Sequence, residues 1–371
     1  MVYIHIPFCH RRCTYCAFYS QTQMGLIDDY LAALDLELKA RADGHAVTTL
    51  YIGGGTPTAL GINGLSRLLN AVASRYDLSD LKECTVECNP EHLTGKFLSE
   101  LRTLGVVNRL SVGIQSFDDK VLRSVNRVHD SATALLALRH CAETGFDNIS
   151  VDLIYGLPNQ RVDSFVGDLA IVSGMIADGV GIHHLSAYAL SVEDGSMLKR
   201  QLDEGRVVLP DEDVVSEDYR LLQEWRNAEG MLHYEVSNYC HGGFESKHNS
   251  RYWDRTPYCG YGAGAHSFSG RVRRWNVSDI KQYIADMASG GRCYDEELLD
   301  GKDAFNETVM TALRTRKGLD SRAVESQYLS HLESGMRRFE EQGWVMKEGN
   351  SYKPTEEGML WADYMAAEMF L

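Results

Sequence analysis

Three cysteines near the start of the chain constrain it more than any other feature. Cys9, Cys13 and Cys16 follow one another at C-x3-C-x2-C spacing, directly after the β-branched run 2–6 that predicts a strand. Three thiolates in one loop suit a cuboidal [4Fe–4S] cluster, because soft sulfur ligands favour iron and zinc. Such a cluster keeps one iron open to an external chelator. The alternatives are a structural zinc with a distant fourth ligand, or three unrelated buried thiols.

The segments after this loop alternate between strand-like and helical patterns. Further strands are expected at 49–55, 81–89, 109–117, 148–156 and 183–190, with amphipathic segments between them. Repeated β–α units imply a parallel sheet with right-handed crossovers. Six units fall short of the eight in a full TIM barrel. We therefore expect an α/β fold, an open partial (β/α)6 barrel, with its chemistry at the carboxyl ends of the strands.

The pattern changes at about residue 286. Helices are expected at 305–314, 321–328, 329–342 and 356–370, with a hairpin at 344–353 that turns at Gly349-Asn350. This order predicts a mainly α, winged-helix-like module over 286–371, after a barrel with its extension over 1–285. Residues 301–371 carry nine Lys/Arg and twelve Asp/Glu, which argues against a DNA-binding role for the module.

Composition narrows the class of protein. The formal net charge is −15, which argues against a broad basic surface for nucleic acid. No apolar run approaches the ~20 residues of a membrane span, and the first residues do not resemble a signal peptide. Nine cysteines without paired spacing point away from a disulfide framework. A cytoplasmic protein is the expectation.

Polar residues mark the inward face of the predicted barrel. The run 53–58 (GGGTPT) would let a ligand approach the backbone closely, and Pro57 fixes its turn. Alternation in 84–89 places Glu87 inside the barrel, where it would bind a ligand or form an internal salt bridge. Gln115 and Asp152 occupy inward positions of the next two strands. Barrel interiors are usually apolar, so these residues predict a ligand-filled cavity.

Several phrases together resemble a known family. YIHIPFCHRRCTYCAF, GGGTPT, ECNP, RLSVGIQSF, VNRVHD and VDLIYGLP are similar to the oxygen-independent coproporphyrinogen III oxidase group of the radical S-adenosylmethionine (SAM) superfamily. The resemblance implies a [4Fe–4S] cluster whose open iron is chelated by SAM. It also implies roles for single positions. Contacts to that SAM fall on Tyr3, Gly54 and Glu87, and the lining of the same cavity, which holds a second SAM in the true oxidases, falls on Gly55, Thr56, Gln115, Arg127 and Asp152.

Two departures from the oxidases favour a neighbouring branch. The true oxidases carry an additional cysteine where this chain has Phe18, and they carry a long segment before the cluster loop, whereas eight residues precede Cys9 here. Both features are similar to the haem chaperone (HemW-like) branch. Oxidative decarboxylation of coproporphyrinogen III is therefore not expected, although the SAM-contact residues are retained.

A later motif carries the haem prediction. The run 248–253 (HNSRYW) resembles the HNxxYW motif of the chaperone branch. A neutral imidazole at His248 is a suitable axial haem ligand, Tyr252 and Trp253 would pack on the porphyrin, and Arg251 would pair with a propionate. The alternative is a hydrogen-bonded loop histidine beside ordinary core aromatics. The glycine-rich run 259–267 offers Cys259 and His266 as secondary ligands.

Two functions from different classes follow. The first is a haem chaperone-like protein that binds [4Fe–4S], SAM and haem and transfers haem to acceptor proteins, including a peripheral membrane acceptor. The second is a radical SAM enzyme that acts on a tetrapyrrole, with coproporphyrinogen III oxidase as one case. The sequence leaves open whether SAM is cleaved productively.

Overall fold

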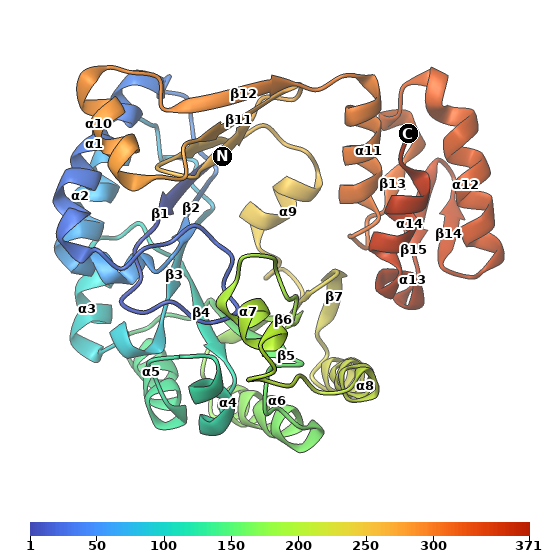
Figure 1. Cartoon of the computed structure of the whole chain (residues 1–371), viewed down its shortest axis with the longest axis horizontal. Helices are drawn as coiled ribbons and strands as arrows, with labels where there is room; N and C mark the ends of the chain where they lie inside the picture. The colour runs from blue at the N-terminus through green and yellow to red at the C-terminus, as the bar shows by residue number, and fades with distance from the viewer.

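The computed structural model describes residues 1–371 and is built around a nine-stranded sheet, shown in Figure 1. Its strand order is β7-β8-β6-β5-β4-β3-β2-β1-β9, and neighbours from β1 to β6 pair in parallel. The six central strands are β1 (Val2–Ile6), β2 (Thr49–Gly54), β3 (Glu83–Cys88), β4 (Arg109–Gln115), β5 (Ile149–Tyr155) and β6 (Ile182–Ala189). The predicted series of six parallel strands is confirmed.

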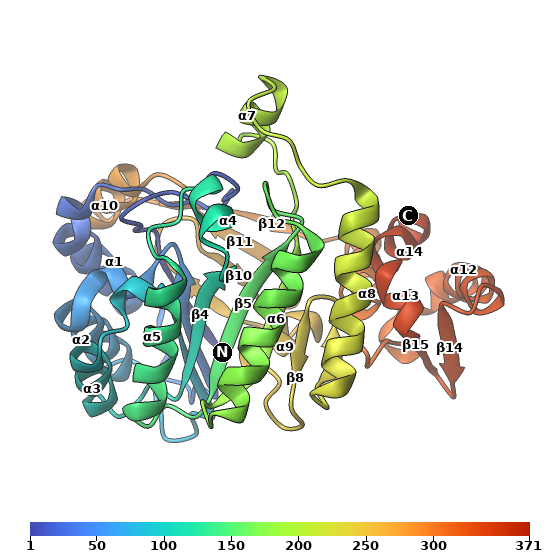
Figure 2. The ribbon, with the colours of Figure 1, turned by 90° about the horizontal axis from the view of Figure 1, so that it is seen from below.

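Helices follow each of these strands. Figure 2 shows α2, α3, α5, α6 and α8 along one face of the sheet, while α7 projects from the body. The helices of this region are α1 (Ile27–Arg41), α2 (Gly61–Ala73), α3 (Gly95–Thr103), α4 (Asp119–Ser124), α5 (Ser131–Glu143), α6 (Val162–Ala177), α7 (Met197–Asp203) and α8 (Glu212–Ala228). None of the chain's helices combines the length and the apolar character needed to cross a membrane.

Alternation in β3 shows why the sheet faces the helices as it does. Cys84, Val86 and Cys88 are buried in the same apolar core as residues of α2 and α3. Thr85 and Glu87 lie at the intervening positions, and successive strand residues point to opposite faces. The predicted inward orientation of Glu87 is confirmed.

Short strands that the sequence pattern did not reveal extend the sheet at both edges. β9 (Cys259–Tyr261) pairs in parallel with β1, and β8 (Asn238–Cys240) pairs antiparallel with β6 and with β7 (Leu232–Glu235). Three or four residues carry too little alternation to predict a strand. The remaining elements before the C-terminal module are α9 (Lys247–Trp253), β10 (His266–Phe268), β11 (Val272–Asn276), α10 (Ile280–Ser289) and β12 (Tyr294–Leu298).

The C-terminal module lies to one side of the sheet, at the right of Figure 1. Its own apolar core runs from Phe305 to Met369 and is separate from the core of the sheet. The module is mainly helical with one small sheet, as expected. It contains α11 (Gly301–Ala312), β13 (Leu319–Asp320), α12 (Leu329–Glu341), β14 (Val345–Glu348), β15 (Ser351–Pro354), α13 (Glu356–Leu360) and α14 (Ala362–Met369).

Two helix predictions in the module were wrong in detail. The segment 321–328 forms two short 3-10 turns, and the last helix is interrupted at Trp361. Ser321 and Ser326, like other short polar residues, favour turns over helix interiors. The division of the chain at residue 285 stays a prediction; α10 runs across that residue, and β12 pairs with β11.

Candidate cluster and cofactor site

The three cysteines lie in a loop that leaves the carboxyl end of β1. Backbone hydrogen bonds close its base, from Cys9 N to Gln21 O at 3.0 Å and from Gln21 N to Pro7 O at 2.8 Å. Its far side is held by Thr14 N, which donates to Val125 O at 3.1 Å. All three cysteines are unpaired and partly exposed. The loop is thus fixed by the surrounding backbone, and its three cysteines are not fully buried.

Two further contacts hold this loop, and the sequence did not single them out. Asn126 Nδ2 donates to Arg12 O at 2.8 Å, from a residue whose φ of 64° suits asparagine. Leu198 N of α7 donates to Thr14 O at 2.8 Å. Helix α4 ends at Ser124, and the chain then turns to meet the loop.

A chain of hydrogen bonds joins two of the cysteines through the predicted site residues Thr56 and Arg127 and through Asn89, which was not predicted. Cys9 Sγ and Thr56 Oγ1 lie 3.5 Å apart, and Asn89 Nδ2 donates to Thr56 Oγ1 at 3.3 Å. Arg127 donates from Nη2 to Asn89 Oδ1 at 3.1 Å and from Nη1 to Cys13 Sγ at 3.4 Å. With Thr56 Oγ1 already accepting from Asn89, its hydroxyl hydrogen is free for a Cys9 thiolate. The sulfurs of Cys9 and Cys13 therefore each have a hydrogen-bond donor, and such donors stabilise thiolates.

The arrangement of the cysteines and their donors can be compared with what a zinc ion and a [4Fe–4S] cluster each require. No set of three or more His, Cys, Asp or Glu side chains is arranged to hold a single metal ion. A zinc ion needs its sulfur ligands about 2.3 Å from one point, whereas a cuboidal cluster takes each thiolate on a different iron. Three separated, partly exposed thiols with donors beside two of them fit a cluster better than they fit zinc.

The glycine run after β2 meets Glu87 at the same end of the sheet. Gly54 N donates to Glu87 Oε2 at 2.9 Å, and the Tyr51 hydroxyl donates to Glu87 Oε1 at 2.8 Å. Burial raises the pKa of Glu87 to about 7, against these two hydrogen bonds, which lower it. The alternative role of Glu87, an internal salt bridge, is not found: its carboxylate is paired with no Lys, Arg or His side chain. Gly54 has a φ of 112°, and a Cβ there would lie 2.5 Å from the His5 ring. Only glycine fits this position.

His5 is a member of this site that the sequence did not predict. Its Nε2 lies 3.0 Å from Tyr19 O, so this nitrogen donates, and Nδ1 accepts from the Tyr3 hydroxyl at 2.9 Å. Burial lowers the pKa of His5 to about 4, which keeps the ring neutral. The sequence signal for His5 was the alternation in β1. It places His5 on the same face of the sheet as the predicted residue Tyr3 and as Tyr51, which contacts Glu87.

Asp152 and Gln115 lie on the inward face of the next strands. Asp152 accepts from Ser111 Oγ at 3.0 Å and from Ser150 Oγ at 3.3 Å, and burial raises its pKa. Gln115 has a φ of 69° at an irregularity in the β4–β5 pairing, which lies between Gly113 and Gln115. A left-handed conformation in a non-glycine residue costs about 1–3 kcal/mol and is common at functional sites.

The remaining predicted residues divide between the two ends of the sheet. Gly55 and Thr56 pack against the cluster loop, with Gly55 N donating to Ile6 O at 2.9 Å and Thr56 N to Phe8 O at 2.7 Å. A Cβ on Gly55 would lie 2.8 Å from Phe8 O. His248 instead lies in α9 at the amino ends of β2 and β3, away from the cysteines.

His248 is enclosed at that amino end. Its exposed fraction is 0%, its Nδ1 lies 3.1 Å from Thr49 Oγ1, and its Nε2 lies 3.1 Å from the Tyr252 hydroxyl. Burial lowers the pKa of His248 to about 3. To ligate iron, this ring would have to give up one of the two hydrogen bonds and reach the surface. Its role as a haem ligand stays a prediction; among the secondary choices His266 is exposed and Cys259 is partly exposed.

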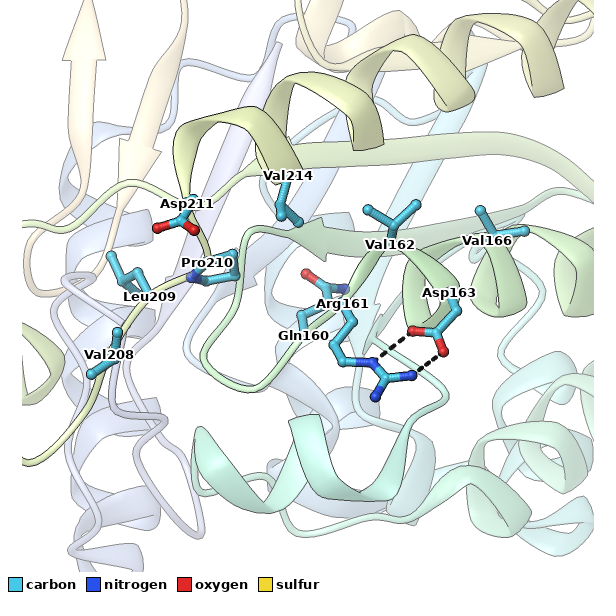
Figure 3. Close-up of a pocket in the computed structure, with 10 residues that line it drawn as sticks. All are labelled: Gln160, Arg161, Val162, Asp163, Val166, Val208, Leu209, Pro210, Asp211 and Val214. Atoms are coloured by element: carbon cyan, nitrogen blue, oxygen red, sulfur yellow. Dashed lines mark hydrogen bonds and ion pairs between the residues drawn. The ribbon is translucent and has the colours of Figure 1, made fainter.

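A surface groove lies away from these residues. It has a volume of about 850 Å³ and lies between the start of α6, the start of α8 and the segment 208–211, as Figure 3 shows. Its walls are largely apolar, and Arg161 pairs with Asp163 inside it. It contains no cysteine or histidine and none of the predicted site residues.

Comparison with known proteins shows which families the chain is similar to. A family model described as the Radical SAM superfamily matches residues 3–170, and one described as the HemN C-terminal domain matches 299–361. Curated relatives named "Heme chaperone HemW" include one from Mycobacterium tuberculosis, 38% identical over 86% of this chain and 82% of its own. Another from Bacillus subtilis is 34% identical over 96% of both chains. A solved structure, coproporphyrinogen III oxidase (HemN) from Escherichia coli, has a TM-score of 0.84 at 24% identity, over 99% of this chain and 89% of that one.

Proposed function

The chain belongs to the radical SAM superfamily, in the HemN-like group near the HemW proteins, and from that premise we propose that it is a haem chaperone. In this proposal it binds a [4Fe–4S] cluster, SAM and haem, and it transfers haem to acceptor proteins. The single observation that carries the cofactor assignment is the hydrogen-bonded chain from Cys9 through Thr56, Asn89 and Arg127 to Cys13. The haem assignment is supported by the names of the relatives.

The residues have separate roles in this proposal. Cys9, Cys13 and Cys16 hold the cluster, which when bound would supply the electron for reductive chemistry on SAM. Arg127 and Thr56 place N–H and O–H donors at two of the sulfurs. The Glu87 carboxylate, fixed by the Gly54 amide, faces the polar groups of SAM, and Tyr3 lies on β1 next to Tyr51 of β2. Gln115, Gly55 and Asp152 line the same cavity.

The proposed partners are haem and the proteins that accept it. We propose a cytoplasmic protein that delivers haem to soluble or peripheral membrane acceptors. Phe18, with an exposed fraction of 71%, stands where the true oxidases carry their additional cysteine, which favours the chaperone over the oxidase. The formal charge of −15 argues against nucleic acid as a partner.

An anaerobic haem titration of the cluster-reconstituted protein tests this function. We expect saturable binding by visible absorbance, followed by transfer of the bound haem to apomyoglobin used as a generic acceptor. The absence of saturable haem binding would contradict the proposal.

A radical enzyme acting on a tetrapyrrole is the second candidate, and it is favoured by the retained SAM-contact positions around one cavity. It requires formation of methionine and 5′-deoxyadenosine in step with the loss of coproporphyrinogen III or haem. Incubating the reduced, reconstituted protein with SAM and each tetrapyrrole separates the two functions, because the chaperone transfers haem unchanged.

A further inference from the structure

The motif 248–253 forms most of helix α9, which closes the amino end of the central strands. Glu83, at the first position of β3, accepts hydrogen bonds from Lys247 N at 2.8 Å and His248 N at 2.9 Å. Ser246 caps the helix by accepting from Asn249 N at 3.2 Å. Because Glu83 is 2% exposed, α9 is anchored to the sheet by a buried carboxylate rather than by surface contacts.

The His248 ring continues this anchor into the barrel. Its two nitrogens are held by Thr49 and Tyr252, so the ring has a fixed orientation. It packs on Tyr51, with ring centroids 5.1 Å apart and planes 33° apart. Aromatic pairs in this range contribute favourable packing beyond simple burial. The contact with His248, at the amino end of the strands, thus helps to fix the orientation of the Tyr51 ring.

Tyr51 in turn reaches the carboxyl end of the sheet. Its hydroxyl donates to Glu87 Oε1 at 2.8 Å, and Glu87 Oε2 accepts from Gly54 N at 2.9 Å. Burial raises the pKa of Tyr51 well above its usual range, so the phenol remains the donor in this pair. A continuous series of contacts therefore runs from α9 through Tyr51 to the glycine run.

We propose that His248 is a positioning residue that holds Tyr51, and through it the Glu87 carboxylate, in the geometry that binds SAM. The proposal rests on the proposed function only in taking Glu87 as a SAM contact. It assigns the HNSRYW motif a role at the SAM site from the opposite end of the barrel, and it accounts for the complete burial of the imidazole.

A double-mutant cycle tests this coupling. SAM affinity is measured by calorimetry on the cluster-reconstituted proteins for wild type, His248→Ala, Tyr51→Phe and the double variant. Tyr51→Phe removes only the hydroxyl, and we expect it to weaken SAM binding by about tenfold, as for the loss of one hydrogen bond to a charged group. His248→Ala should weaken it in the same direction, and the double variant should be no weaker than Tyr51→Phe alone. Additive losses would overturn the proposal, because contacting residues that act through one path are not additive.

Two further variants separate positioning from folding. His248→Gln keeps a hydrogen-bonding side chain and should recover part of the SAM affinity that His248→Ala loses; it also keeps the test open should His248→Ala fold poorly. His233→Gln is the matched control, since His233 is equally buried but bonds to Val236 O and Glu356. It should leave SAM affinity unchanged.

Haem binding by the same variants distinguishes this inference from the proposed function. Loss of haem binding with unchanged SAM affinity in His248→Ala would overturn the positioning role in favour of a haem ligand. A wild-type protein that binds SAM but no haem would overturn the chaperone function and leave the positioning role standing. A wild-type protein that binds no SAM would overturn both.

Discussion

The two ends of the central sheet are both polar, but they use their polar groups differently. At the amino end, Glu83 is fully engaged by the amides of α9, and both nitrogens of His248 have partners inside the protein. At the carboxyl end, the cysteines are partly exposed, and the donors of Arg127 and Thr56 point at sulfur. The first end is closed by contacts within the protein, and the second is the end where we propose that the cofactors bind. Polarity alone therefore does not distinguish the two ends; the partly exposed cysteines do.

The largest difference between the two ends is expected for substitution of a cysteine at the carboxyl end. Cys13→Ala should abolish the iron content and visible absorbance of the reconstituted protein, because a cluster loses a required ligand. Circular dichroism should show an unchanged fold. Cys259→Ala is the matched control, a partly exposed cysteine at the edge strand β9 that should keep the full cluster. An intact cluster in Cys13→Ala would refute the ligand assignment.

A substitution at the amino end should lower the stability of the protein without reducing its cluster content. Glu83→Ala leaves the amides of Lys247 and His248 without partners, and we expect the free energy of unfolding to fall by ~2–4 kcal/mol in urea titrations. Cluster loading at low temperature should stay unchanged. Lys247→Ala, an exposed position of the same helix, serves as control. Loss of the cluster before loss of stability would mean that the two ends are not distinct.

Glu87 allows the carboxyl end to be tested through pH. Burial raises its pKa to about 7 from an ordinary value of 4.5, so the folded state holds this proton more tightly than the unfolded chain. The stability gained is therefore full below about pH 4.5 and is lost as the pH rises through 7. Glu87→Gln should remove a pH-dependent difference of roughly 1–3 kcal/mol between pH 4.5 and pH 8, at ~1.4 kcal/mol per pKa unit.

Thermal unfolding across that pH range measures the Glu87 effect. Glu235→Gln provides the comparison, since burial also raises the pKa of Glu235 to about 7, away from the cysteines. Both variants should flatten the pH profile, but only Glu87→Gln should also weaken SAM binding. Equal SAM affinity in the two variants would remove Glu87 from the site.

The smallest expected effect is at the bridging hydroxyl. Thr56→Val keeps the side-chain volume but removes the oxygen shared by Cys9 and Asn89, a change worth about 1 kcal/mol. The cluster should assemble and then be lost to a chelator roughly fivefold faster than in the wild type. Thr58→Val is the control, because Thr58 bonds His92 outside this chain of contacts. Equal loss rates for the two variants would show that the bridge is not coupled to the cluster.

The sequence predicted the parts of the molecule that repeat or that obey a strict pattern. The six parallel strands, the inward face with Glu87, and the hairpin at Gly349-Asn350 are where alternation and turn chemistry placed them. Asn89, His5 and Asn126 were missed as site residues, since their contacts join segments far apart in the chain. The burial of His248 was also beyond a local pattern, because it depends on Glu83 and Thr49 from two other strands.

The most direct test of the account is the effect of SAM on the reduced cluster. Electron paramagnetic resonance spectra of the reconstituted, reduced protein would be recorded with and without SAM, for wild type and Glu87→Gln. An open iron chelated by SAM predicts a changed spectrum in the wild type and a higher SAM concentration for the same change in the variant. A wild-type spectrum that SAM leaves unaltered would contradict a cofactor site at the carboxyl end of the sheet.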